Sequence, residues 1–81
     1  MQNIETSVLR LISNNFRRAE ATLESSFLKD LAFDSLTFVE LLMVCESEFN
    51  LEFSSAEAKD IQSVRSLIEL ISQKLASQTV H

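Results

Sequence analysis

Apolar residues recur at spacings of three and four along three segments of the chain, the pattern of helices with one buried face. The segments cover residues 4–16, residues from about 35 to 50, and the stretch that follows Ser63. The last segment carries one apolar face, made of Val64, Leu67, Ile68, Ile71 and Leu75. No segment alternates between apolar and polar residues as a half-buried strand would. The pattern therefore predicts an all-α fold.

Polar side chains are expected to set the helix ends, because the chain contains no glycine and no proline. Asp34 stands where the second helix needs an N-cap, and Ser63 stands where the last helix needs one. Ser54 and Glu57 have the spacing of a capping box, which predicts a short further helix that ends near Asp60. The expected fold is a bundle of three main helices and one short helix.

The connections are less regular. Residues 13–15 include two asparagines, and asparagine tolerates the left-handed conformation that ends many helices, so the first helix is expected to stop there. Residues 17–26 then form a long first loop, whose end we expect Phe27, Leu28 and Leu31 to pin to the core. With 81 residues the chain has room for one domain, 1–81, with a frayed tail at about 77–81.

The second helix is apolar on two sides. One broad stripe is suited to the core and contains Phe38, Leu41, Leu42, Cys45 and Phe49. An adjacent stripe contains Leu36, Val39 and Met43, with Asp34, Glu40 and Glu46 beside it. Because so small a domain can hardly bury a helix on every side, the second stripe is interpreted as an acid-rimmed contact surface for a partner. The alternative is an unusually central helix.

Negative charge is concentrated in the middle of the chain. The net charge is −5, and residues 30–60 hold eight acidic residues against one basic residue, Lys59. Such a surface repels phosphate backbones and anionic lipids, which disfavours nucleic acid and membrane surfaces as partners. A protein with a basic docking patch is the natural complement, although the acids could also serve solubility alone.

The location expected from the sequence is the cytoplasm. No apolar run approaches the roughly 18 residues of a membrane span. The first residues lack the basic region and apolar block of a signal peptide. The one cysteine cannot form an internal disulfide, which fits a reducing compartment.

Ser35 is the one residue whose setting suggests covalent chemistry. It directly follows the expected cap Asp34, so it should point outward from the first turn of a helix, near backbone N–H groups that favour an anion. The single histidine is His81, so no serine–histidine couple is credible and another enzyme would have to modify Ser35. Cys45 is expected to be a small buried apolar group, and no residue spacing suggests a metal site.

From about Ile4 to Ala76 the sequence resembles the acyl carrier proteins. The resemblance is strongest in the segment Ser26-Phe27-Leu28-Lys29-Asp30-Leu31-Ala32-Phe33-Asp34-Ser35-Leu36. It continues in two short stretches after that segment, Val39-Glu40-Leu41 and Glu46-Ser47-Glu48-Phe49. Asp-Ser-Leu alone is a weak motif, but the combination with the acidic helix and the chain length is specific.

The resemblance implies a non-catalytic, monomeric carrier with the four-helix acyl carrier fold. Ser35 would bear a 4′-phosphopantetheine arm, attached from coenzyme A by a separate magnesium-dependent phosphopantetheinyl transferase, and Asp34 would assist the attachment. Acyl groups would travel as thioesters on the arm to acyl-loading, condensing and acyl-transfer enzymes. The partner-facing positions of the family correspond here to Leu36, Val39, Glu40, Met43 and Glu46.

Several positions depart from the family pattern and leave the pathway open. Ala32 stands where glycine is common, and because alanine disfavours positive φ the loop is expected to differ locally. Phe33 and Phe38 add bulk, and Thr37 and Ser47 replace positions that are often acidic. A dedicated carrier of specialised lipid or polyketide synthesis therefore stands beside a general fatty-acid carrier.

Two further alternatives remain. A peptidyl or aminoacyl carrier is the nearest, although those proteins more often have a non-acidic residue before the serine, so Asp34 favours acyl cargo. The other is a helical interaction domain, in which Ser35 only helps to start a helix and the apolar stripe binds a partner.

Overall fold

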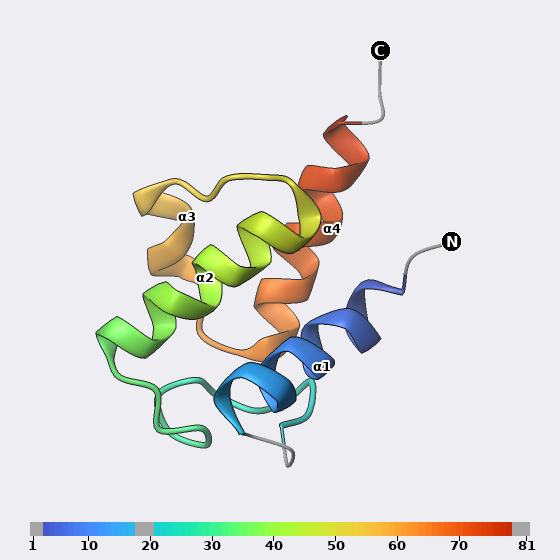
Figure 1. Ribbon diagram of the computed structural model, residues 1–81. Helices are drawn as coiled ribbons and strands as arrows, with labels where there is room; N and C mark the ends of the chain where they lie inside the picture. Colours follow the sequence, from blue (N-terminus) through green and yellow to red (C-terminus); the bar gives the residue numbers. More distant parts are fainter. Residues whose placement is uncertain (1–2, 18–20, 79–81) are drawn as a thin grey trace.

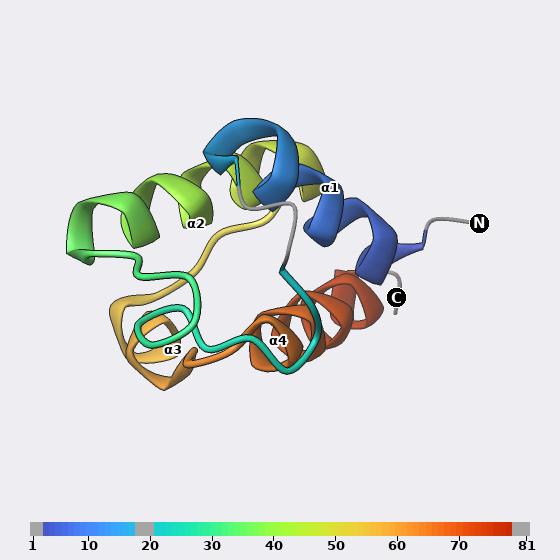
Figure 2. The same ribbon diagram turned by 90° about the horizontal axis from the view of Figure 1, so that it is seen from below.

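The computed structural model describes residues 3–17 and 21–78, and these residues form four helices (Figure 1). The helices are α1 (Ile4–Phe16), α2 (Ser35–Phe49), α3 (Ser55–Asp60) and α4 (Val64–Gln78). In the long connection between α1 and α2, the described residues 21–34 run beside the start of α4 (Figure 2). The predicted all-α fold, with three main helices and one short helix, is confirmed.

Side-chain caps start the helices as the sequence predicts. The Oδ1 atom of Asp34 accepts the backbone N–H of Thr37 at 2.8 Å. Ser54 and Glu57 form the full capping box, with hydrogen bonds of 3.1 and 2.8 Å in the two directions. Ser63 Oγ accepts the N–H of Ser66 at 3.3 Å at the start of α4. Each of these bonds satisfies a backbone donor that has no partner within its helix.

The ends of the helices differ in part from the prediction. The predicted helical segment 4–16 coincides with α1, but the asparagines of residues 13–15 lie within the helix and do not end it; the left-handed residue at its end is Arg17, with φ 57°. The prediction was wrong because it used intrinsic preference alone, whereas the helix continues for as long as its apolar face has the core to pack against. Helix α4 extends to Gln78 and so includes two residues of the segment expected to fray. Residues 79–81 lie outside the described part of the chain, as do residues 18–20 of the first loop.

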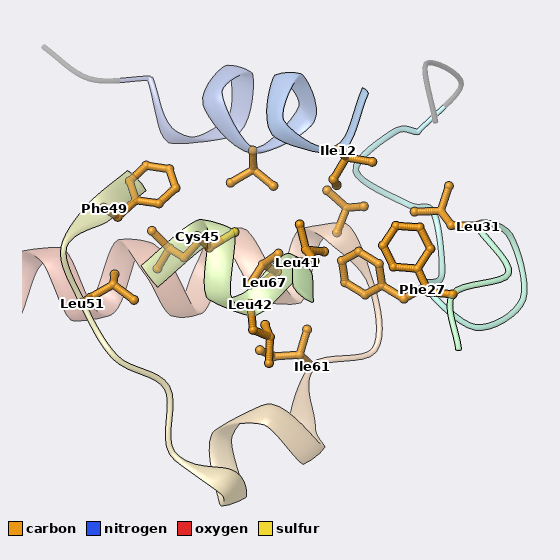
Figure 3. Close-up of a cluster of buried hydrophobic side chains, with 14 residues drawn as sticks. Ile12, Phe27, Leu31, Leu41, Leu42, Cys45, Phe49, Leu51, Ile61 and Leu67 are labelled. Atoms are coloured by element: carbon orange, nitrogen blue, oxygen red, sulfur yellow. The ribbon is translucent and has the colours of Figure 1, made fainter. Parts of the chain in front are cut away.

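The core lies between α1, α2 and α4 (Figure 3). Helix α1 contacts both α4 and α2. The stripe of α2 predicted to face the core is buried at four positions, Leu41, Leu42, Cys45 and Phe49, while Phe38 is half-buried against the same cluster. Val8 and Ile12 meet it from α1, and Leu67 and Ile71 from α4. Burial of these side chains is the main force that holds the helices together.

The end of the first loop is anchored to the core by two residues rather than three. Phe27 is 4% exposed and Leu31 is 1% exposed, but Leu28 is 74% exposed, so its predicted burial is wrong. The N–H groups of Asp30 and Leu31 both bond to the carbonyl of Ser26 at 3.0 Å, which closes the segment into a compact turn. Within such a turn, residues 27 and 31 face the same side, and residue 28 must face another.

The same segment is fastened to the start of α4. The N–H of Phe27 bonds to the carbonyl of Gln62 at 3.1 Å, and the N–H of Val64 bonds to the carbonyl of Ser25 at 3.0 Å. The carboxylate of Asp30 accepts the N–H of Ser26 at 2.7 Å. The first two bonds connect the loop to the start of α4 and the third lies within the loop, so the position of the loop does not depend on hydrophobic contacts alone.

Ala32 adopts the left-handed conformation, with φ 55°. Its side chain is exposed, so no packing interaction compensates for the steric cost of this conformation in a residue that has a Cβ atom. The loop therefore keeps a turn that glycine would form more easily, and alanine bears the strain two residues before Asp34.

Replacing Ala32 by glycine should therefore stabilise the fold. We expect Ala32→Gly to raise the free energy of unfolding by about 0.5–1 kcal/mol, since glycine removes the steric cost but adds backbone entropy to the unfolded chain. Urea denaturation followed by circular dichroism measures the change. Ala56→Gly is the matched control, because Ala56 is exposed within α3 and the same change should destabilise the protein. A loss of stability in both variants would contradict the expectation.

Candidate functional site

Ser35 is the first residue of α2, and its side chain is exposed. Asp34, which precedes it, is the N-cap and has extended backbone angles, with φ −84° and ψ −179°. Because Asp34 serves as the cap, the hydroxyl of Ser35 is not needed for that bond. The result is an accessible hydroxyl at the positive end of a 15-residue helix dipole.

The carboxylate of Asp34 is held in its charged form. Its hydrogen bonds from Thr37, above all from the backbone N–H, lower the pKa of Asp34 below its ordinary value. A lowered pKa means that the folded state favours the carboxylate, so this bond supports the helix start at neutral pH and is lost as the pH falls through the folded-state pKa. Beside Ser35 there is therefore a fixed negative charge at neutral pH.

A groove of about 560 Å³ opens next to Ser35. Lys29, Asp34 and Ser35 contribute polar groups, and the apolar lining comes from Phe27, Leu28, Phe33, Phe38 and Ile61. The loop, the first turns of α2 and the connection before α4 thus meet at this place. A pantetheine-like chain attached to the hydroxyl would find both solvent and an apolar wall within reach, so the residues present fit such a group.

Aromatic side chains form the floor of the groove. The ring centroids of Phe27 and Phe38 are 5.4 Å apart, and those of Phe27 and Phe33 are 5.7 Å apart. Phe33 in turn lies 5.4 Å from Phe16 of α1. These distances are typical of favourable tilted ring pairs, so the floor is continuous with the core. The sequence indicates the bulk of Phe33 and Phe38, but their packing with Phe27 in one cluster depends on the fold of the loop.

The second stripe of α2 faces solvent. Leu36 is 70% exposed, Met43 is 60% exposed and Val39 is 49% exposed. The alternative of a helix buried on every side is therefore wrong. Exposed large apolar residues on one helix face are typical of a surface that contacts another protein.

The acidic residues along α2 do not all have the same role. Glu40 is exposed. Glu46 is half-buried, and its Oε2 atom accepts the backbone N–H of Phe53 at 2.8 Å, across the connection from α2 to α3. Glu46 thus braces that connection, a contact that the sequence does not reveal because its partner is a backbone group seven residues away.

Other candidate chemistry is absent from the described residues 3–17 and 21–78. The thiol of Cys45 is buried, and desolvation, with smaller contributions from Glu48 and Glu46, raises its pKa to about 12. Within these residues, no cluster of metal-ligating side chains occurs. Over the same part of the chain, we find no helix with the length and apolar character needed to cross a membrane.

Comparison with known proteins identifies the class. Residues 6–71 match the family described as "Phosphopantetheine attachment site". The fold and this match define a phosphopantetheine-binding carrier domain.

Curated relatives and solved structures narrow the class further. The chain is 41% identical over 73 residues to the acyl carrier protein of Buchnera aphidicola subsp. Baizongia pistaciae, covering 88% of this chain and 94% of the relative. The acyl carrier protein of Thermotoga maritima superposes with a TM-score of 0.78 at 28% identity, covering 90% of this chain and 87% of that one. A Mycobacterium tuberculosis protein described as an acyl carrier protein gives a TM-score of 0.83 at 25% identity, covering 89% and 99%. The chain belongs to the acyl carrier protein family.

Membership establishes the general activity. The protein is a non-catalytic carrier that holds acyl groups on phosphopantetheine, and it works with a phosphopantetheinyl transferase and with synthase enzymes. The predicted family, fold and cofactor are confirmed.

The reactivity of the Cys45 thiol tests its buried position in the core. We expect Cys45 in the folded, unmodified protein to resist an aromatic disulfide reagent at pH 8 and to react fully in denaturant, because a buried neutral thiol is neither accessible nor ionised. Since the folded-state pKa lies above the ordinary value of 9.0, the stabilisation from the neutral thiol is complete below about pH 9 and is lost as the pH rises toward 12. Absorbance of the released reagent measures the reaction. Rapid labelling of the folded protein would contradict this placement of Cys45.

Proposed function

We propose that Ser35 is the residue that bears the phosphopantetheine arm. The observation that carries the proposal is the position of its exposed hydroxyl at the start of α2, directly after the capping Asp34 and beside the apolar groove. A phosphodiester at this place lies near N–H groups at a helix start, which stabilise negative charge.

The attachment transfers the 4′-phosphopantetheinyl group of coenzyme A to the hydroxyl of Ser35. The Oγ atom of Ser35 forms a bond to the phosphorus of coenzyme A that bears the pantetheine. The bond from that phosphorus to the bridging oxygen of the pyrophosphate breaks, and adenosine 3′,5′-bisphosphate leaves. The hydroxyl proton passes to a base of the transferase. In this step the carrier supplies the acceptor oxygen.

Asp34 would assist this attachment. Its charge adjoins the acceptor, and the bond from Thr37 N–H fixes its position, so it can help to hold the magnesium and coenzyme A that the transferase brings. Carboxylate oxygens are suitable ligands for magnesium.

The loaded carrier would deliver acyl groups to enzymes with basic docking patches. The exposed stripe of Leu36, Val39 and Met43, together with Glu40 and the outer part of Glu46, supports a partner surface along α2. We infer a single, monomeric domain that acts in the cytoplasm, in fatty-acid, specialised lipid or polyketide synthesis. Asp34 favours acyl over peptidyl cargo.

Mass spectrometry of the intact protein tests the attachment. After incubation with coenzyme A, magnesium and a broad-specificity phosphopantetheinyl transferase, we expect the mass to rise by one phosphopantetheinyl group. Ser35→Ala should abolish the gain, because the acceptor oxygen is removed.

Ser55→Ala provides the matched control. Ser55 is also an exposed serine at the first position of a helix, directly after an N-cap. This variant should be modified like the wild type. A wild type without any gain, or a gain that survives Ser35→Ala, would refute the assignment.

A further inference from the structure

The exposed side chain of Leu28 lies beside Ser35 on a different element from α2. Leu28 is 74% exposed, the largest value among the exposed large apolar residues described, and it contributes to the wall of the groove that contains Ser35. Leu36, 70% exposed, adjoins Ser35 along α2. Two exposed leucines, one from the loop and one from the helix, therefore flank the acceptor hydroxyl.

The backbone around Leu28 is well fixed. Phe27 before it is buried, and its N–H bonds to Gln62. The N–H of Lys29 after it bonds to Ser26 Oγ at 3.2 Å, and Leu31 is buried. A fixed turn presents Leu28 to solvent at little entropic cost upon binding, which is a property of an interface anchor.

Direct reaction at Ser35 requires an enzyme to cover these residues. Enzymes that act on cargo can reach it at the end of a long arm, but the transferase must bring its phosphorus atom to the Oγ atom of Ser35 itself. Its surface must then lie against the wall of the groove, where Leu28 loses water on contact. The transferase is for this reason the occupant that the position of Leu28 indicates.

Charge distinguishes this contact from the surface of α2. Lys29, exposed and on the same wall, carries a positive charge, whereas Glu40 on α2 carries a negative one. Among the residues that the structure describes, the ion pairs join Arg65 to Glu24 and Lys74 to Glu57, so neither involves Lys29. A complementary enzyme surface has an acidic group opposite the loop and basic groups opposite the helix.

We propose, on the basis of the proposed attachment at Ser35, that Leu28 and Lys29 form a second contact for the phosphopantetheinyl transferase, with Leu28 as its apolar anchor and Lys29 as its charged neighbour. This contact is separate from the face of α2. It holds the carrier from the loop side, so that Ser35 lies between two contact regions of the transferase, one at the loop and one on α2.

Transferase kinetics on the unmodified protein test the proposal. We expect Leu28→Ala to lower kcat/KM at least about fivefold through a higher KM, with kcat little changed, because the acceptor and its helix stay in place. Leu28→Met should retain most of the activity, since it keeps the apolar surface. Lys29→Glu should lower kcat/KM about threefold or more at low salt, and added salt should relieve part of the loss.

Controls separate docking from folding and from the attachment itself. Lys59→Glu makes the same charge change at an exposed position of α3, and its kinetics should match the wild type. Thermal unfolding of Leu28→Ala should match the wild type, because an exposed side chain contributes little to the core. If Leu28→Ala has the same kcat/KM as the wild type, Leu28 is not an apolar anchor. If Lys29→Glu has the same kcat/KM as the wild type at low salt, Lys29 is not a charged contact. Absence of any modification of the wild type instead overturns the attachment at Ser35, and this inference with it.

Discussion

The burial of Phe27 and Leu31 is the contact on which the position of Ser35, the proposed acceptor, depends. These two side chains hold the end of a long loop in the core, and the bond from Phe27 N–H to Gln62 ties the loop to the connection before α4. Only three residues separate Leu31 from Ser35, so the start of α2 has little freedom once Leu31 is buried. Long loops are ordinarily mobile, and these buried contacts restrict the part that leads to Ser35.

The helix start then gives Ser35 its chemical setting. Asp34 serves as the cap, which leaves the next residue exposed at the end of the helix where partial positive charge accumulates. The core behind it, in the part of the chain that the structure describes, is built of apolar and aromatic side chains. This arrangement suits a carrier, because a group attached to the exposed Ser35, the proposed acceptor, would be accessible to other enzymes without disturbance of the packing.

Local signals made much of this structure predictable. The caps Asp34, Ser54 and Ser63 bond to groups three residues away, so sequence spacing reveals them, and helical periodicity reveals the buried stripe of α2. The features that escaped prediction depend on neighbours distant in sequence or on backbone angles. Leu28 faces outward because of the turn closed by Ser26, and Glu46 bonds to a backbone group beyond the end of its helix. Likewise, no local preference indicates that Arg17 rather than an asparagine ends α1.

The most direct test uses two-dimensional nuclear magnetic resonance spectra of the backbone amides, recorded before and after modification. The spectra show whether the arm is attached at the surface of a helix bundle that is already folded without it. Attachment at Ser35 should shift the amides of the first turn of α2 and of Ile61 and Gln62 across the groove, because these lie nearest the new phosphodiester and arm. Amides of the buried part of α1, such as those of Val8 and Ile12, should stay unchanged. Unchanged amides at the start of α2, or large shifts throughout α1, would contradict the placement of the arm on the surface of a preformed helix bundle.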